Sequence, residues 1–204
     1  MEFLNSIDTE LFLLINGMHN AFFDPIMYWL SNKLFWVPMY LLIVFLMIRR
    51  YKMRGVLMIL FVGIVITLCD QTASGLLKNI VQRLRPSHEP TLAGLVHLSK
   101  AGPGGLYGFV SSHAANVFGL ATFLFFVLDN QFKPLKYWLF IWAILVSYSR
   151  IYNGVHYPGD IVVGAFIGIG YGYLMAKAYF RSNIYLLKRE QKKYTTKLDG
   201  NSDN

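Results

Sequence analysis

The chain has 204 residues, of which 55% are hydrophobic and only 15% are charged, and its mean hydropathy is +0.42. A soluble domain has nearer a quarter of its residues charged, so this composition indicates an integral membrane protein of one domain. The net charge of +8 does not indicate nucleic-acid binding, because most of the excess lysine and arginine flanks apolar segments; the single cysteine, Cys69, excludes an intramolecular disulfide and a cysteine-based zinc site.

The first segment, from Ile7 to Phe23, mixes apolar and polar residues. The first ten residues, MEFLNSIDTE, are acidic rather than basic and lack a small-residue cleavage site, so we expect no cleavable signal peptide. We predict an amphipathic helix that lies at the membrane interface and leads into the first span. The alternative is a sixth span, but the apolar run is well short of spanning length.

Five apolar segments follow, at residues 26–48, 55–77, 112–128, 136–150 and 159–180. Each approaches the roughly 20 residues needed to cross a bilayer only when its polar ends are counted. We therefore predict an all-α integral membrane bundle of five transmembrane helices, or six in the alternative, with an N-terminal interfacial helix. Residues 1–182 would form the membrane-embedded domain and residues 183–204 a basic to polar tail.

Lysine and arginine in the short loops predict the orientation of the chain. The turn at residues 49–54, the turn around Lys133 and Lys136, and the C-terminal tail are all basic, and two spans separate each of them from the next. All three therefore belong on the cytoplasmic side. The loop at 78–111 and the turn at 150–158 would then face the extracytoplasmic side of the plasma (inner) membrane.

Polar residues gather in the two outward-facing connections, and the first cluster is cationic. Lys78 closes the second span, and Arg85 follows seven residues later, before Pro86. Proline disfavours helical geometry at the preceding residue, so Arg85 should lie where the helix ends. Taken alone, these cations are better explained as side chains that snorkel to lipid headgroups, and Arg83 fits that explanation best.

The second cluster consists of Ser111, Ser112 and His113, just before the third span. Serine is a strong helix cap, which is the simple explanation of this cluster. A helix N-terminus is also an anion site, because its backbone N–H groups are free and its dipole end is positive. His113 would stand beside a bound anion as a proton donor.

The third cluster contains Arg150, His156 and Asp160, with Pro158 at the start of the last span. Proline is favoured in a first helical turn, so His156 should lie just outside the helix and Asp160 just inside it. The carboxylate could then accept a hydrogen bond from Nδ1–H and leave Nε2 free to attack. The alternative is that Asp160 only caps the helix.

A metal site is the chemical rival, because two histidines and an aspartate can bind zinc. Lys78, Arg85 and Arg150 would repel a divalent cation and favour an oxyanion. We therefore expect neither a metal nor another cofactor. In the last span, Gly164, Gly168 and Gly172 recur at every fourth position, which is typical of close helix packing in membranes.

Together the three clusters resemble the type 2 phosphatidic acid phosphatase superfamily, the lipid phosphate phosphatases. The family pattern is K-x6-R-P, P-S-G-H and S-R-x5-H-x3-D, and the chain carries it between Lys78 and Asp160. The first and third motifs match at every specified position, whereas the second has Val110 in place of proline and Ser112 in place of glycine.

The resemblance implies a role for each of these residues. His156 would be the nucleophile that forms a phosphohistidine, Asp160 would orient it, and His113 would protonate the leaving group. The phosphate would be bound by Lys78, Arg85, Ser111, Ser112 and Arg150. The division is physically reasonable, because phosphoryl transfer needs mainly positioning and stabilisation of spread negative charge.

The expected substrate is a lipid phosphate held within the bilayer. Undecaprenyl pyrophosphate is the favoured candidate, and phosphatidate, phosphatidylglycerol phosphate and lipid A phosphates are the others. A phosphotransferase would use the same phosphohistidine. A non-catalytic lipid-binding or transport protein is a third hypothesis, although pure binding needs no pairing of a nucleophile with an acid.

Overall fold

The computed structural model describes the backbone of residues 2–199 and the side chains of residues 5–184. Within that part the regular elements are helices, and Leu84 and Tyr107 form an isolated antiparallel β-bridge. The longer elements are α1 (Glu2–Gly17), α2 (Phe23–Ser31), α3 (Val37–Tyr51), α4 (Met53–Asp70), α6 (Ser112–Val127), α7 (Lys133–Tyr152) and α8 (Pro158–Asp199). The short ones are η1 (Lys33–Trp36), the π-helix η2 (Gln71–Leu77), α5 (Lys78–Val81), η3 (Pro86–His88), η4 (Pro90–Leu92) and η5 (Asn130–Phe132).

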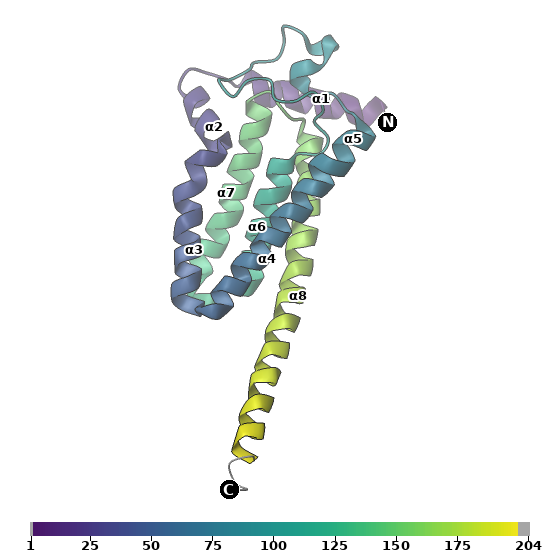
Figure 1. Cartoon of the computed structure of the whole chain (residues 1–204). Helices are drawn as coiled ribbons and strands as arrows, with labels where there is room; N and C mark the ends of the chain where they lie inside the picture. Colours follow the sequence, from purple (N-terminus) through teal and green to yellow (C-terminus); the bar gives the residue numbers. More distant parts are fainter. Residues whose placement is uncertain (1, 200–204) are drawn as a thin grey trace.

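The long helices α3, α4, α6, α7 and α8 form a bundle, and α6 lies inside it, packed on α4, α7 and α8 (Figure 1). Three stretches are long and apolar enough to cross a membrane: Lys33–Tyr51, Met53–Val81 and Pro158–Ile184. The shorter apolar helix α6 and the 20-residue α7 run beside them. The predicted all-α membrane bundle is confirmed.

The helix α1 lies across one end of the bundle instead of along it, as the interfacial helix was predicted to do (Figure 1). It contacts α7 and α8. The first predicted span, residues 26–48, is divided into α2, η1 and α3. Asn32 makes the break, because its side-chain oxygen accepts a hydrogen bond from the backbone N–H of Leu34 at 2.9 Å and caps η1.

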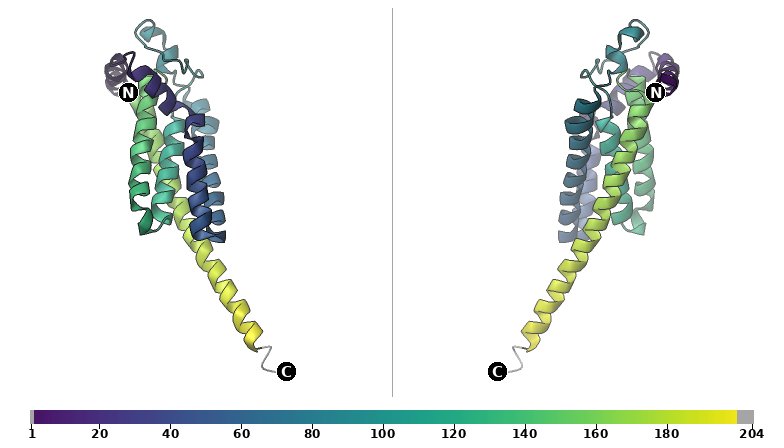
Figure 2. Two further views of the ribbon diagram at one scale, coloured as in Figure 1. Left: turned by 90° about the vertical axis from the view of Figure 1, so that its left-hand side faces the viewer. Right: turned by 90° about the vertical axis from the view of Figure 1, so that its right-hand side faces the viewer.

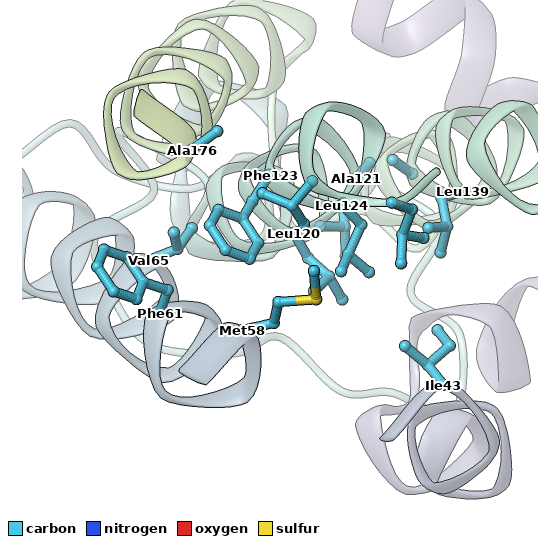
Figure 3. Packing of buried hydrophobic residues seen from close by; sticks show 14 of the residues in the cluster. Ile43, Met58, Phe61, Val65, Leu120, Ala121, Phe123, Leu124, Leu139 and Ala176 are labelled. Carbon is cyan, nitrogen blue, oxygen red and sulfur yellow. The ribbon is translucent and has the colours of Figure 1, made fainter. Parts of the chain in front are cut away.

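Buried apolar side chains from the bundle helices meet in one core (Figure 3). Val65 of α4 and Phe123 and Leu124 of α6 are completely buried there. The rings of Phe61 and Phe123 stack with centroids 6.3 Å apart. This packing fixes the relative positions of the helices. The polar clusters that these helices carry lie at one end of the bundle.

The contact between α6 and α8 is closer than side chains would allow. A Cβ on Gly164 would lie 2.6 Å from the carbonyl oxygen of Ser111, and one on Gly168 would collide with the carbonyl of Ala115. The predicted role of these glycines in helix packing is therefore confirmed. Past the bundle, α8 continues to Asp199 (Figure 2), so the predicted boundary after residue 182 falls inside this helix, and residues 200–204 lie outside the described part.

Candidate active site

His156 and Asp160 form a buried pair where α8 begins. Nδ1 of His156 lies 3.2 Å from Oδ2 of Asp160, and the two residues are 1% and 0% exposed. The backbone N–H of Tyr157 donates to the same carboxylate oxygen at 3.0 Å. Since the carboxylate accepts from Nδ1–H, the lone pair of Nε2 points away from Asp160 and faces the guanidinium of Arg85. The pair therefore has the geometry of an oriented nucleophile.

Arg85 lies on the other nitrogen of the same imidazole. Its Nη1 is 3.4 Å from Nε2 of His156 and donates to the carbonyl of Val155 at 3.2 Å, while its Nε donates to the carbonyl of Tyr107 at 3.2 Å. Gly104, with φ of +71°, makes room for this side chain, because a Cβ there would lie 2.9 Å from Nη1. Arg85 is thus held by backbone carbonyls beside the position that a phosphoryl group would take.

Burial lowers the pKa of His156 well below its ordinary value, and the positive charges of Arg85, Arg150 and Lys78 lower it further. The imidazole is consequently neutral at neutral pH. A neutral imidazole is the form that has a lone pair for attack on phosphorus.

Lys78 and Ser112 bring the first and second clusters together. Nζ of Lys78 donates to Oγ of Ser112 at 3.1 Å and to Oγ of Ser74 at 3.4 Å, and the two hydroxyl oxygens lie 2.6 Å apart. Lys78 follows directly on the π-helix η2, a rare geometry that often occurs at functional sites. Ser111 caps α6 by accepting a hydrogen bond from the backbone N–H of Ala114 at 3.5 Å.

The second and third clusters meet through the backbone. The N–H of Ser111 donates to the carbonyl of Asp160 at 3.1 Å, so the first turns of α6 and α8 are joined beside the site. Arg150, in the last turn of α7, donates through Nη1 to the hydroxyl of Ser31. Its Nε is buried and has no hydrogen-bond partner among the described residues, so this donor is available to an anion.

His113 lies in the first turn of α6 and lines a cavity of about 320 Å³. Apolar side chains make up most of its wall, among them Val117, Leu120 and Trp142. The polar side chains on the wall include those of Ser31, Lys33, His113 and Asn116. The cavity therefore has polar groups close to Arg150 and an apolar remainder enclosed by α3, α4, α6 and α7.

Arg83 was interpreted from the sequence as a snorkelling cation, and that interpretation was wrong. Its Nη1 lies 2.7 Å from Oδ2 of Asp8 and 3.2 Å from Oδ1 of Asp160, and its guanidinium lies over the ring of Tyr157 at 4.0 Å. Asp8 was not predicted as a site residue at all. The sequence shows only an acidic residue in the predicted N-terminal helix, which is far along the chain from the three clusters.

The model of the PAP2 superfamily matches residues 52–184 of this chain. A lipid A 4'-phosphatase from Bacteroides thetaiotaomicron is 41% identical over 84% of this chain and 76% of its own length. One from Porphyromonas gingivalis is 35% identical over 88% and 75%. An undecaprenyl-diphosphatase from Sulfolobus acidocaldarius is 31% identical over 79% and 73%.

Solved structures show the same fold. The crystal structure of Aquifex aeolicus LpxE superposes with a TM-score of 0.63 at 31% identity, over 83% of this chain and 94% of that one. A transmembrane PAP2-type phosphatidylglycerolphosphate phosphatase from Bacillus subtilis gives the same TM-score at 22% identity, over 89% and 88%. With the family model covering well over half of the chain, the protein belongs to the PAP2 superfamily and is a multi-pass membrane phosphatase that hydrolyses a lipid phosphate.

Proposed function

We propose that this membrane phosphatase removes a phosphate from a lipid A-type glycolipid through a phosphohistidine, without a metal. The observation that carries the chemistry is the buried pair of His156 and Asp160, with Arg85 at 3.4 Å from Nε2. The substrate class follows from the two lipid A 4'-phosphatases, which are 41% and 35% identical to this chain. The undecaprenyl-diphosphatase is 31% identical, so the relatives support lipid A more strongly than undecaprenyl pyrophosphate, which the sequence-based prediction favoured.

In the first step Nε2 of His156 attacks phosphorus, a nitrogen–phosphorus bond forms, and the bond from phosphorus to the lipid oxygen breaks. Lys78, Arg85 and Arg150 stabilise the charge on the phosphoryl oxygens, together with Ser111, Ser112 and the free N–H groups of α6. His113 gives its proton to the departing oxygen. In the second step water attacks phosphorus, His113 takes a proton from the water, the nitrogen–phosphorus bond breaks, and inorganic phosphate leaves His156.

The cavity beside His113 offers a place for part of an acyl chain. Its volume of about 320 Å³ is at the lower end of the range of ligand sites, and its wall is mainly apolar. Val117→Phe would fill part of this space from α6. We expect KM to rise about 10-fold for a long-chain lipid phosphate and to stay constant for a water-soluble phosphate ester, because only the lipid loses apolar burial.

The test is the release of inorganic phosphate by purified protein in detergent from lipid A bisphosphate, undecaprenyl pyrophosphate and phosphatidate, with and without EDTA. We expect the fastest release from lipid A and no effect of EDTA. Mass spectrometry of the product would show which sugar keeps its phosphate. Loss of activity with EDTA, or normal turnover by His156→Ala, contradicts the mechanism. Faster release from undecaprenyl pyrophosphate contradicts the substrate.

The same assay separates hydrolysis from transfer, because a phosphotransferase would release little phosphate until an acceptor alcohol is added.

The orientation of the protein in the membrane needs a separate experiment. We propose an extracytoplasmic site, because the exposed basic turn with Arg49, Arg50 and Arg54 lies at the opposite end of the bundle. The buried Cys69 gives little background, so an impermeant maleimide should label Lys100→Cys in intact cells and leave Arg54→Cys unlabelled. The reverse labelling would contradict this orientation.

A further inference from the structure

Asp160 uses its two carboxylate oxygens for different partners. Oδ2 faces Nδ1 of His156 at 3.2 Å and the backbone N–H of Tyr157 at 3.0 Å, whereas Oδ1 faces Nη1 of Arg83 at 3.2 Å. The residue is 0% exposed, so its carboxylate depends on these protein partners for its hydrogen bonds. The orientation of the carboxylate toward His156 therefore depends on what holds Oδ1.

Arg83 is held from two sides at the position where it contacts Asp160. Nη1 is 2.7 Å from Oδ2 of Asp8, and the guanidinium carbon lies 4.0 Å above the ring of Tyr157. The exposed fractions of the Arg83 and Asp8 side chains are 22% and 13%. This arginine therefore lies on the carboxylate oxygen of Asp160 that does not face His156.

Asp8 also binds the first turn of α8 directly. Its Oδ1 accepts a hydrogen bond from the backbone N–H of Gly159 at 2.7 Å, which satisfies one of the free donors of that helix end. A Cβ on residue 159 would lie 2.8 Å from Oδ2 of Asp8, so a larger residue here would displace this carboxylate. One carboxylate from α1 thus binds both Arg83 and the residue before Asp160.

A second contact fixes α1 at the other end of the active-site turn. Asn16 is 1% exposed, and its side-chain amide donates to the carbonyls of Tyr152 at 2.8 Å and His97 at 2.9 Å. Asp8 and Asn16 are about 12 Å apart along the helix axis, from a rise of 1.5 Å per residue. α1 therefore holds both ends of the turn that contains His156.

We propose that Asp8 and Arg83 are positioning residues of the phosphatase reaction, through which α1 orients Asp160 and hence His156. The inference rests on the proposed phosphohistidine mechanism. Arg83 fixes Oδ1 of Asp160, and Asp8 fixes Arg83 and balances its charge. Without them the carboxylate turns away from Nδ1, and the imidazole loses the tautomer and direction needed for attack.

The test compares Arg83→Gln, Arg83→Lys and Asp8→Asn with the wild-type protein. We expect Arg83→Gln to lower kcat on the order of 100-fold with KM unchanged, since misplacing a reacting group by about 1 Å costs that much. Arg83→Lys should recover most of the activity. Asp8→Asn should lower kcat about 10-fold alone and add little to Arg83→Gln, because the two residues act through one contact.

Two anions separate positioning from substrate binding. Orthovanadate mimics the transition state and needs Nε2 of His156, whereas inorganic phosphate is held by the cations. Arg83→Gln should weaken vanadate inhibition and leave phosphate inhibition unchanged. If KM and the inhibition constant of phosphate rise together, Arg83 is a substrate contact and the proposal is wrong. The proposal is also wrong if activity per folded molecule stays at the wild-type level.

A matched ion pair at the far end of the bundle serves as the control. Nη2 of Arg50 lies 3.1 Å from Oδ2 of Asp129, so Arg50→Gln and Asp129→Asn remove a similar contact and should keep the wild-type kcat. If Arg83→Gln does not fold, Gly159→Ala disturbs the Asp8 contact without removing a charge, and it should lower kcat with KM unchanged.

Failure of the proposed function has a different signature. Wild-type protein that releases no phosphate from any lipid contradicts the proposed function. The positioning role can still be tested then, because a shift in Tm with vanadate requires no turnover, and this shift should be smaller for Arg83→Gln. An unchanged vanadate shift overturns the role.

Discussion

Nδ1 of His156 and Oδ2 of Asp160 lie 3.2 Å apart, and both side chains are almost completely buried. Asp160→Asn keeps the shape but places an amide beside Nδ1. The imidazole then loses the partner that fixes its tautomer. We expect kcat to fall on the order of 1,000-fold or more, as in other nucleophilic or general-base histidines that lose their carboxylate.

The measurement is phosphate release at saturating lipid, with Tm recorded for both proteins to confirm that the variant is folded. Folded Asp160→Asn with kcat within about two-fold of wild type would show that the carboxylate serves only as a helix cap.

His113 is proposed to protonate the leaving oxygen. His113→Ala should therefore lower kcat by about 100-fold or more for a lipid phosphate, whose alkoxide leaves poorly without a proton. For p-nitrophenyl phosphate the loss should be small, because nitrophenolate leaves unprotonated. His88, which contacts Ser87 in the outer loop at 3.1 Å, provides the control, and His88→Ala should behave as wild type with both substrates. Equal losses on the two substrates would assign His113 to phosphate binding instead.

Stability should depend on pH through His156. Burial lowers the pKa of His156 below 6.5 in the folded protein, so the unfolded chain binds the proton more readily. As pH falls through 6.5, the unfolded state gains protons that the folded state does not, and the free energy of unfolding falls. Tm in detergent should therefore fall between pH 7 and pH 5. The fall should be smaller for His156→Gln, and equal slopes would contradict the assignment.

The closeness of α6 and α8 gives a prediction about stability alone. Gly168→Ala places a methyl group against the carbonyl of Ala115, whereas a Cβ on Gly170 meets nothing within 4 Å. We expect Gly168→Ala to lower the free energy of unfolding by about 1–3 kcal/mol, the usual cost of overpacking. Gly170→Ala should leave Tm unchanged or slightly raised. A similar Tm for both variants would show that the helices move apart freely.

The sequence predicted the bundle and the convergence of the three clusters, because both depend on local patterns. Apolar runs set the helices, and the spacing from His156 to Asp160 places His156 just before one helix and Asp160 in its first turn. The glycines on α8 were informative for the same reason, since their four-residue period describes one face of a helix.

Contacts between segments far apart in the chain could not be predicted in this way. Arg83 pairs with Asp8, which lies 75 positions earlier, and Arg150 donates to Ser31 from 119 positions away. Neither partner stands in a sequence pattern that distinguishes it from other polar residues. The break at Asn32 was missed because one capping hydrogen bond outweighed an apolar run that continues through it.

The glycine contact between α6 and α8 fixes the geometry of the reacting groups, whereas the sequence of other parts of the molecule can change. His113 and Asp160 stand on α6 and α8, whose backbones meet at Gly164 and Gly168, so the spacing of the reacting groups is set by main-chain atoms. Part of the cavity wall comes from α3 and α4, which leave this contact untouched. Libraries that randomise those two helices should therefore shift acyl-chain preference while the catalytic residues keep their positions.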